Sequence, residues 1–250
     1  MKEVVLVSGE NNYARKRIIE ESSKLDISIT DYWDIRDEVD YVATFNRRSS
    51  AALMKYQRGR QINDLVKSIF WRDKINQLIC LENVCRVPKF MLGKGLSYEL
   101  VSNVLDVPFI AKMSNSCQGK GVFLVRNYED FKLASNCDVF EEVIWNSLGK
   151  DVRVFCINGE VKRCMLRVNQ DNFKSNFHQG GRGTNYEISD EIKQIAKSIY
   201  DVSKLDIMGI DLLIDKNCFV FCEVNTNPGI EELERACNYN AAKDILSLCL

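Results

Sequence analysis

Two β-rich runs joined by a polar turn, GIDLLIDKNCFVFCEV, lead into NTNPGI and constrain the fold of this chain more than any other segment. A three-residue loop in the turn predicts an antiparallel pair in which Asp211 lies opposite Glu223. Because side chains alternate along a strand, Glu223 and Asn225 are expected to share one face, with Cys222 and Val224 on the other. The sequence therefore predicts two carboxylates and an amide on one face of a hairpin.

Oxygen-bearing side chains gathered in this way indicate a cation site. Two carboxylates at contact distance repel each other unless one is protonated or a cation bridges them. Magnesium prefers oxygen ligands in octahedral geometry, so Asp211, Glu223 and Asn225 are candidate ligands for one or two magnesium ions, with manganese as the alternative metal. The competing interpretation is that these acids form ordinary salt bridges or face water.

The composition is that of an ordinary soluble protein without a strong electrostatic field. The 250 residues are 46% hydrophobic and 28% charged, and the formal net charge is −1. We expect no nucleic-acid partner, because there is no excess of basic residues to attract phosphates. No apolar run reaches the ~18 residues that span a bilayer, and the opening MKEVVLVSGE turns polar too early for a secretory signal. We therefore expect a cytoplasmic protein with no membrane partner.

The cysteine spacing indicates neither zinc nor a disulfide framework. Ten cysteines include no C-x-x-C pair, and His178 is the only histidine in the sequence. We expect most of the thiols to be reduced core residues. Cys117 lies in a glycine-rich segment, and both incidental exposure and a redox role stay open for it.

Hydrophobic periodicity predicts three successive units of helices and strands, an α+β chain. The first unit has predicted strands at 4–9, 27–30 and 40–45, a helix at 13–24, and helical periodicity over 50–82. The second has strands at 107–113, 122–125 and 138–144 and a short helix at 128–134. The third has a hairpin turn at Asn158-Gly159, a helix at 189–203 capped by Ser189, and the hairpin described above. We expect lobes at 1–71, 72–144 and 145–250.

The glycine-rich stretch SNSCQGKGV between two predicted strands is a candidate phosphate-binding loop. Glycine at 119 and 121 would let the backbone approach an anion, although a plain β-hairpin explains the same residues. Lys112 precedes this loop in the apolar strand PFIAKM. Since lysine is rarely buried alone, Lys112 indicates a bound anion or a nearby acid, unless its stem only lies along the surface.

Further candidate ligand contacts follow along the chain. The adjacent acids of FEEVI face opposite ways, and Asp151 follows at a distance that would allow it to reach a ribose hydroxyl. Solvated acids at a strand end are the alternative. Arg153 and Arg167 flank the Asn-Gly hairpin, where ideal alternation places them on opposite faces, so a shared site requires a bulge. The stretch NFKSNFHQGGRG offers Lys174, Asn176 and His178 as anion contacts, although a lone histidine is more often structural.

In this order the segments resemble the ATP-grasp superfamily and, within it, the RimK-like carboxylate-amine ligases. The matching segments cover roughly residues 71–231 and read WRDK, PFIAKM, SCQGKGV, FEEVI, GKDVRVFCINGEV, LRV, NFKSNFHQGG, MGIDLL and CEVNTNPGI. The resemblance implies an ATP-grasp fold, in which a short N-terminal α/β lobe precedes two α+β lobes that clamp a nucleotide.

The resemblance also implies a role for each candidate residue. Lys74, Lys112 and the loop around Gly119 and Gly121 would contact the phosphates. The adenine hinge would be Glu141, Glu142, Val143 and Ile144, with Asp151 at the ribose. The metal ligands would be Asp211, Glu223 and Asn225. The γ-phosphate and the acyl phosphate would be faced by Arg153, Arg167, Lys174 and Asn176.

The activity that the resemblance implies is an ATP- and magnesium-dependent ligation. A carboxylate would be activated as an acyl phosphate and joined to an amine of a small molecule or peptide. The alternatives are a ligase with a hydroxyl or thiol acceptor, a kinase-like enzyme that stops at phosphoryl transfer, and a non-catalytic nucleotide-binding protein. The first lobe matches the family least. Its segment NRRSS is either an anion-binding or a solvated loop, and the identity of both substrates and any homo-oligomer stay open.

Overall fold

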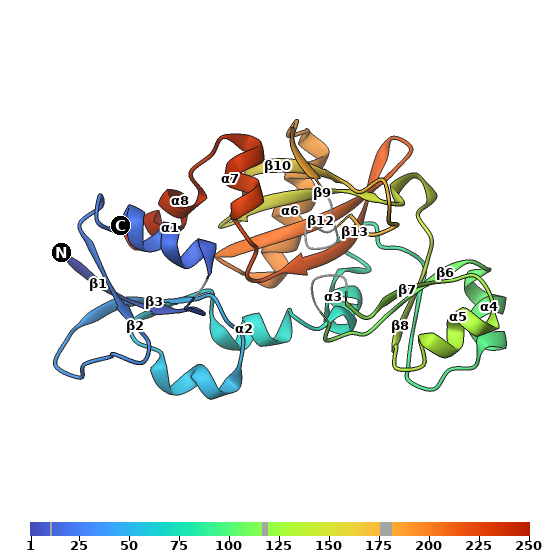
Figure 1. Ribbon diagram of the computed structural model, residues 1–250, viewed down its shortest axis with the longest axis horizontal. Coiled ribbons are helices and arrows are strands. Elements are labelled where there is room, and N and C mark those ends of the chain that lie inside the picture. Colours follow the sequence, from blue (N-terminus) through green and yellow to red (C-terminus); the bar gives the residue numbers. More distant parts are fainter. Residues whose placement is uncertain (11, 117–119, 176–181) are drawn as a thin grey trace.

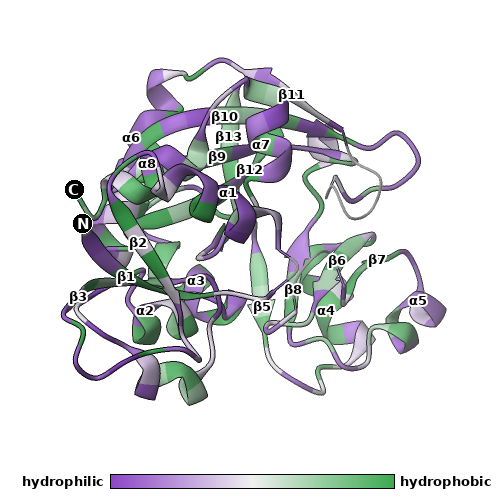
Figure 2. Ribbon diagram, turned by 60° about the vertical axis from the view of Figure 1, so that its left-hand side comes forward, coloured by the Kyte–Doolittle hydropathy of each residue, from purple (hydrophilic) through white to green (hydrophobic). Residues whose placement is uncertain are grey.

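The computed structural model describes residues 1–10, 12–116, 120–175 and 182–250. Its strands form three sheets, one of five strands and two of four. In Figure 1 the N-terminal sheet and the sheet that contains β6–β8 lie at opposite ends of the molecule, and the five-stranded sheet spans above them. Figure 2 shows the same arrangement from another side. None of the helices in the described part of the chain has the length and apolar character of a membrane span.

The N-terminal sheet is parallel and has the order β2-β1-β3-β4. Its strands are β1 (Lys2–Val7), β2 (Ile27–Asp31), β3 (Tyr41–Asn46) and β4 (Arg60–Ile62), and helix α1 (Tyr13–Ser22) connects the first two. Asn12 caps α1 by accepting a hydrogen bond from the Ala14 amide. The predicted helix and strands of this unit are therefore confirmed, with their ends shifted by a few residues.

The prediction of helical structure throughout 50–82 is wrong. This segment contains a 3₁₀ helix η1 (Ala51–Tyr56), strand β4, and helices α2 (Leu65–Phe70) and α3 (Lys74–Leu81). The 3₁₀ helix ends at Tyr56, and Gln57 is already extended. Gly59, with a φ of +57°, then passes so close to β3 that a Cβ would clash with the Tyr41 carbonyl oxygen, and β4 pairs with β3.

The second sheet is antiparallel and has the order β5-β8-β6-β7. Its strands are β5 (Phe90–Leu92), β6 (Phe109–Lys112), β7 (Val122–Val125) and β8 (Val139–Glu142), with helices α4 (Tyr98–Leu105) and α5 (Tyr128–Leu133). Phe109 and Phe140 pack with Val101 of α4 in the core of this lobe. The three predicted strands and the predicted helix are confirmed, whereas β5 and α4 were not predicted.

The five-stranded sheet has the order β11-β10-β9-β12-β13. Its strands are β9 (Lys150–Ile157), β10 (Glu160–Val168), β11 (Arg182–Tyr186), β12 (Ile207–Asp215) and β13 (Cys218–Asn225), and helix α6 (Asp190–Ser203) packs against it. Asn158 and Gly159 have φ of 49° and 78°, which confirms the predicted Asn-Gly turn. Ser189 caps α6 as predicted, because its hydroxyl accepts the Ile192 amide.

The lobes share cores and are not independent units. Helices α7 (Glu231–Cys237) and α8 (Ala241–Ser247) contribute Leu233 and Ile245 to a core that also contains Leu6 and Phe45. In the same way α3 contributes Leu81 to the core of the five-stranded sheet. Side chains thus pack across both predicted boundaries, after residues 71 and 144. The division into three lobes at these residues stays a prediction.

The Asn-Gly turn gives a stability prediction. Gly159→Ala should lower the free energy of unfolding by about 2–3 kcal/mol, because a positive φ costs a residue with Cβ ~1–2 kcal/mol and overpacking adds to it. The added Cβ would lie 2.6 Å from Cγ of Tyr200.

Gly95→Ala is the matched control, because Gly95 also has a positive φ, +72°, but open space around its Cβ position. Urea unfolding should therefore show a clearly smaller loss for Gly95→Ala. Equal losses in the two variants would contradict the packing argument.

Candidate active site

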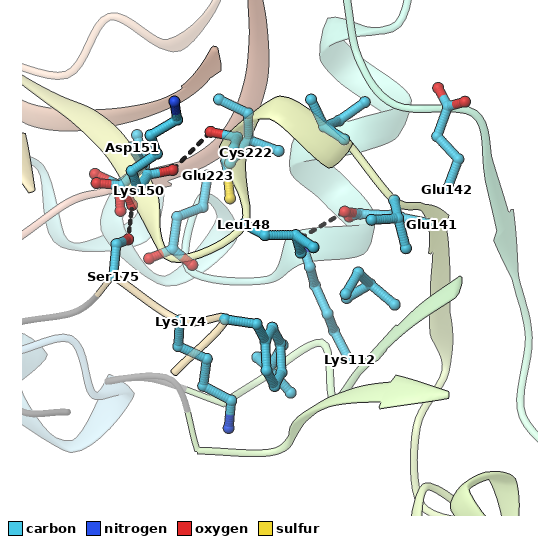
Figure 3. Close-up of a pocket in the computed structure, with 18 of the residues that line it drawn as sticks. Lys112, Glu141, Glu142, Leu148, Lys150, Asp151, Lys174, Ser175, Cys222 and Glu223 are labelled. Atoms are coloured by element: carbon cyan, nitrogen blue, oxygen red, sulfur yellow. Dashed lines mark hydrogen bonds and ion pairs between the residues drawn. The ribbon is translucent and has the colours of Figure 1, made fainter. Parts of the chain in front are cut away.

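A cavity lies between the second sheet and the five-stranded sheet, and polar side chains from both line it (Figure 3). Strands β6 and β8 supply one wall, and β12, β13 and the start of β9 supply the other. Of the residues predicted from the sequence, the cavity is lined by Lys74, Lys112, Glu141, Glu142, Val143, Ile144, Asp151, Lys174, Asp211 and Glu223. Side chains from distant parts of the sequence therefore converge on one place.

A β-bulge in β13 determines which side chains reach this cavity. Leu212 pairs with Phe221, but the next pair is Asp211 with Glu223, so Cys222 is the extra residue. The predicted pairing of Asp211 with Glu223 is confirmed. The turn has two residues and not the three expected, and the extra residue in the bulge makes up the difference. The prediction that Cys222 faces away from the site is wrong, because the bulge presents Cys222 and Glu223 together to the cavity.

A second bulge, in β10, brings the two predicted arginines together. The register shifts at Lys162, between the Val161 and Arg163 pairs. As a result Arg167 lies opposite Asp151, two residues from Arg153 on β9. The sequence required a bulge if Arg153 and Arg167 were to serve one site, and this bulge is present.

Asp151, Arg153, Arg167 and Asp211 form a buried charge network across β9, β10 and β12. Arg167 donates to both carboxylate oxygens of Asp151 at 2.6 Å, and its Nη2 also lies 2.8 Å from Oδ2 of Asp211. Arg153 donates to both oxygens of Asp211 through Nε and Nη2. Ser175 completes the network by donating to Oδ2 of Asp151 at 2.5 Å. The two cations thus neutralise two carboxylates that are both almost inaccessible to water.

The two carboxylates differ in the number of guanidinium groups they contact. Burial alone would raise the pKa of Asp211, but Arg153 and Arg167 together hold this pKa well below its usual range. Burial raises the pKa of Asp151, and its one guanidinium partner, which is shared with Asp211, does not offset that effect. Asp211 is therefore the firmly ionised member of the pair.

Two lysines form ion pairs with acids that line the same cavity. Nζ of Lys112 lies 2.6 Å from Oε2 of Glu141, and both side chains are buried. Burial lowers the pKa of Lys112, but the charge and hydrogen bond of Glu141 act together with the nearby Cys222 and Glu223 to outweigh burial, and the net shift is upward. Nζ of Lys74 lies 3.6 Å from Oε2 of Glu223 and donates to the Ser116 carbonyl at 2.7 Å. The sequence indicated an acid or an anion near Lys112, and the acid is present.

Helix α3 also holds the backbone of β13 from its outer edge. β13 is an edge strand, and Gln77 pairs with it as a neighbouring strand would. Its Oε1 accepts the Val224 amide at 2.7 Å, and its Nε2 donates to the Val224 carbonyl at 2.9 Å. Val224 lies next to Glu223, so Gln77 fixes the strand at the bulge. Nothing in the sequence pattern distinguished Gln77 from an ordinary helix residue.

Comparison with known proteins identifies the family. The sequence matches the RimK-like ATP-grasp domain over residues 72–249. The chain belongs to this family. It is 32% identical over 185 residues to a probable alpha-L-glutamate ligase of Haemophilus influenzae (strain PittEE), covering 70% of this chain and 62% of that protein. It is 34% identical over 149 residues to beta-citrylglutamate synthase B of Homo sapiens, covering 56% of this chain and 39% of that protein.

Solved ATP-grasp structures share the fold over nearly the whole chain. The ATP-grasp ligase PsnB complexed with a minimal precursor superposes with a TM-score of 0.77 at 16% identity, covering 99% of this chain and 98% of that one. D-alanine–D-alanine ligase from Bacillus anthracis gives 0.72 at 12% identity, covering 100% and 96%. The predicted α+β ATP-grasp fold is thereby confirmed. This chain spans about six-tenths of the length of the first curated relatives.

The structure places the remaining ATP-grasp candidates as follows. Glu141 and Glu142 face opposite ways as predicted: Glu142 points away from Lys112 in Figure 3, and its Oε1 accepts the Lys89 amide. Asn225 does not line the cavity, and its Oδ1 accepts the Asn227 amide at 3.0 Å. Gly121 has a φ of +67°, and a Cβ there would lie 2.6 Å from Sδ of Met113.

Some candidates lie outside the described residues, and some wall residues were missed. Gly119, Asn176, Cys117 and His178 fall outside the described part of the chain. Lining residues that the sequence did not single out are Ile110, Ser116, Val122, Ser147, Leu148, Lys150, Phe173, Ser175, Leu213 and Cys222. Alternation along the predicted strands could have found Ile110 and Leu213, which lie two residues from Lys112 and Asp211.

The charge network gives a prediction for the RimK-like core. Arg167→Met should lower the free energy of unfolding by about 3–5 kcal/mol at pH 7, because it leaves the buried carboxylate of Asp151 without its cation. The deficit should shrink towards pH 5, because burial raises the pKa of Asp151 and protonation removes its uncompensated charge. Urea unfolding at the two pH values measures both effects.

Two further variants test the cause. Adding Asp151→Asn to Arg167→Met should recover part of the stability. Arg86→Met is the control, since Arg86 is half exposed and pairs with Asp215 at 2.7 Å, and an exposed pair contributes less than about 1 kcal/mol. A pH-independent deficit in Arg167→Met would contradict the assignment.

Proposed function

We propose that this protein is an ATP- and magnesium-dependent ligase that activates a carboxylate as an acyl phosphate and joins it to an amine. The observation that carries the proposal is the convergence of Asp211 and Glu223, which pair across β12 and β13, with Lys74 and Lys112 on the wall of one cavity. Arg153 and Arg167 are not among the lining residues but hold the carboxylate of Asp211. Membership of the RimK-like ATP-grasp family supports it, as do relatives that are named ligases or synthases.

The nucleotide would lie between the two sheets. In this proposal Lys74 and Lys112 contact phosphates, and Gly119 and Gly121 belong to the loop that covers them. Glu141, Glu142, Val143 and Ile144 form the adenine hinge, and Asp151 is near the ribose. The cavity measures about 110 Å³, whereas pockets for ligands of this size measure ~300–1,000 Å³. We therefore infer that its walls move apart when a nucleotide enters.

Asp211, Glu223 and Asn225 would hold one or two magnesium ions, or manganese. For this, Asn225 would turn its Oδ1 from the Asn227 amide to the metal, and Asp211 would share its oxygens between the metal and the two arginines. The oxygen atoms of the three side chains are the ligands that these ions prefer, and Asp211 stays ionised because of its guanidinium neighbours. When bound, the metal would neutralise charge on the phosphates during phosphoryl transfer. Lys74 lies beside Glu223 in the structure and would then turn from this acid towards a phosphate. A solved relative in fold, the ligase PsnB, has been observed with Mg and ADP.

The reaction would proceed in two steps. Transfer of the γ-phosphoryl group to a carboxylate oxygen breaks the bond to ADP and forms a mixed anhydride. An amine nitrogen then attacks the acyl carbon, phosphate leaves, and the nitrogen loses a proton. Arg153, Arg167, Lys174 and Asn176 would stabilise the negative charge that develops on the phosphoryl oxygens.

Glutamate is the first substrate to test. The curated relatives include a probable alpha-L-glutamate ligase, beta-citrylglutamate synthase B and N-acetylaspartylglutamate synthase A, names that share glutamate. A mass-spectrometric screen for ATP-dependent condensation products, with glutamate among the amines and peptides among the carboxylates, would identify the pair. Trapping with hydroxylamine separates acyl-phosphate formation from a kinase-like reaction, and the absence of any product would favour a nucleotide-binding protein.

Glu223→Gln tests the metal assignment. The variant should lower the rate of product formation at least ~100-fold, since removal of a single charge-stabilising group costs about this much in other active sites. Product formation is measured by mass spectrometry with the substrate pair from the screen.

Glu160→Gln is the control, because Glu160 is an exposed acid of β10 that pairs with Lys162. Both variants should give circular dichroism spectra like the wild type. Wild-type turnover in a folded Glu223→Gln protein would refute the role of Glu223.

Lys112→Ala tests the nucleotide site. It should weaken ATP binding at least ~10-fold in calorimetry, since a charge-assisted hydrogen bond contributes ~1.5–3 kcal/mol. Lys132→Ala, which removes an exposed lysine paired with Glu129, should leave the affinity within twofold. Equal ATP affinity in the two variants would contradict the proposed phosphate contact.

A further inference from the structure

Arg47 is a buried cation that no acid among the described residues neutralises. It follows the last residue of β3 and is 5% exposed. Its Nη2 donates to the Pro228 carbonyl at 2.7 Å, while its Nε is buried without a hydrogen-bond partner. Burial lowers the pKa of Arg47 to about 10, and no carboxylate of the described residues forms an ion pair with it. The guanidinium group thus lacks a counter-ion.

The other buried cations of this protein differ from Arg47. Arg153 and Arg167 bind Asp211 and Asp151, and Lys112 binds Glu141. A buried charge without a partner costs several kcal/mol, so proteins rarely retain one without a ligand or a second function. The missing partner of Arg47 is therefore the feature that requires an explanation.

A buried acceptor without a partner belongs to Asn227, a residue that contacts the backbone of Arg47. Oδ1 of Asn227 is buried and accepts no hydrogen bond, whereas its Nδ2 donates to the Arg47 carbonyl oxygen. A vacant donor on Arg47 and a vacant acceptor on Asn227 therefore belong to one cluster of contacts. A group that offers an anionic oxygen next to an N–H or O–H would satisfy both. A bridging water molecule is the simplest alternative occupant.

The position of this cluster in the fold also points to a ligand. In the parallel order β2-β1-β3-β4, the chain continues from β1 to β2 on one side and from β3 to β4 on the other. The Arg47 amide donates to the Val7 carbonyl at the carboxyl ends of β1 and β3, between these two connections. Ligands of parallel sheets bind outside the carboxyl ends of the strands at such a point. Gly9, after β1, and Gly229, after Pro228, have no atom within 4 Å of an added Cβ, so the chain is open at these two neighbouring positions.

The cluster is also close to the proposed reaction centre. Pro228, whose carbonyl binds Arg47, lies against Gly209, where an added Cβ would be 2.8 Å from Cβ of Pro228. The same Cβ would be 3.5 Å from Nη1 of Arg153. Arg153 binds Asp211 in the charge network. Gly209 is therefore the residue that lies between Pro228, which binds Arg47, and this network.

We propose that Arg47 and Asn227 bind a carboxylate group of the substrate that is not the nucleotide, with Arg47 as its counter-ion and Asn227 accepting from an adjacent N–H or O–H. The inference rests on the proposed ligase function and adds a substrate class, namely amino acids or other small molecules that keep one carboxylate free of the reaction. Arg48, next in sequence, is exposed and is not part of this site.

Calorimetry with defined probes tests the inference. The full chain, saturated with magnesium and the non-hydrolysable analogue AMPPNP, is titrated with L-glutamate, L-aspartate, citrate and N-acetyl-L-aspartate. At least one probe should bind the wild type, and Arg47→Met should weaken its binding at least ~10-fold, as expected for a charge-assisted hydrogen bond. Arg47→Lys should retain part of the affinity, and Arg48→Met, the matched control for charge, should stay within twofold. Replacing the recognised carboxylate by a carboxamide should weaken binding to the wild type but not to Arg47→Met.

Thermal unfolding without probe separates binding from a structural role. Because Arg47 has no acid partner among the described residues, Arg47→Met should unfold at a midpoint no lower than that of Arg48→Met. If Arg47 instead serves mainly as a structural contact between the lobes, Arg47→Met should unfold at a lower midpoint. Failure of every probe to bind the wild type, equal probe affinity in Arg47→Met and Arg48→Met, or a selective loss of stability in Arg47→Met would each overturn the inference. Failure to bind AMPPNP would count instead against the proposed ligase function, and the probes are then titrated without nucleotide.

Discussion

The buried pairing of two guanidinium groups with two carboxylates is the constraint on which the rest of this structure depends. Arg153, Arg167, Asp151 and Asp211 lie on three adjacent strands, and none could be buried there without the others. Each strand must therefore keep its register, since a slip by one residue would turn a charged side chain into the apolar core. The charge network thus fixes the centre of the five-stranded sheet as firmly as its apolar contacts do.

Helix α3 connects this centre to the second sheet, which contains β6. Gln77 holds the backbone of β13, and Lys74, one turn earlier, reaches Glu223 on the same strand. The first turn of the helix also contacts the segment after β6, where the Lys74 amide donates to the Ser114 carbonyl and Asp73 accepts from Asn115. One short helix thereby joins the edge of the large sheet to the loop that opens the β6–β7 hairpin.

The sequence predicted the parts of the fold that local chemistry determines. The Asn158-Gly159 turn, the cap of α6 at Ser189 and the acid near Lys112 depend on a few neighbouring residues, and all three are present. The pairing of Asp211 with Glu223 was also predicted, but from a longer turn than the chain adopts.

What the sequence could not predict depends on contacts between distant segments. No local pattern marks Lys162 or Cys222 as the extra residue of a bulge, because ladder pairing with another strand determines where the register shifts. The strand that interrupts the helical pattern after Gly59 depends on pairing with β3, which passes close to this glycine. Gln77 and Ser175 became recognisable as parts of the candidate site once the strand or acid that each contacts was in place.

The shared core of the N-terminal lobe has a consequence for biosynthesis. Val4, Leu6 and Phe45 are covered in part by Leu233, Ala241 and Ile245, which lie near the other end of the sequence, and Lys2 donates to the carbonyls of Cys249 and Leu250. While the ribosome is still translating the central segments, this apolar surface has no cover. The first lobe can therefore complete its core only after the last helices emerge, and its apolar surface is exposed to water in that interval.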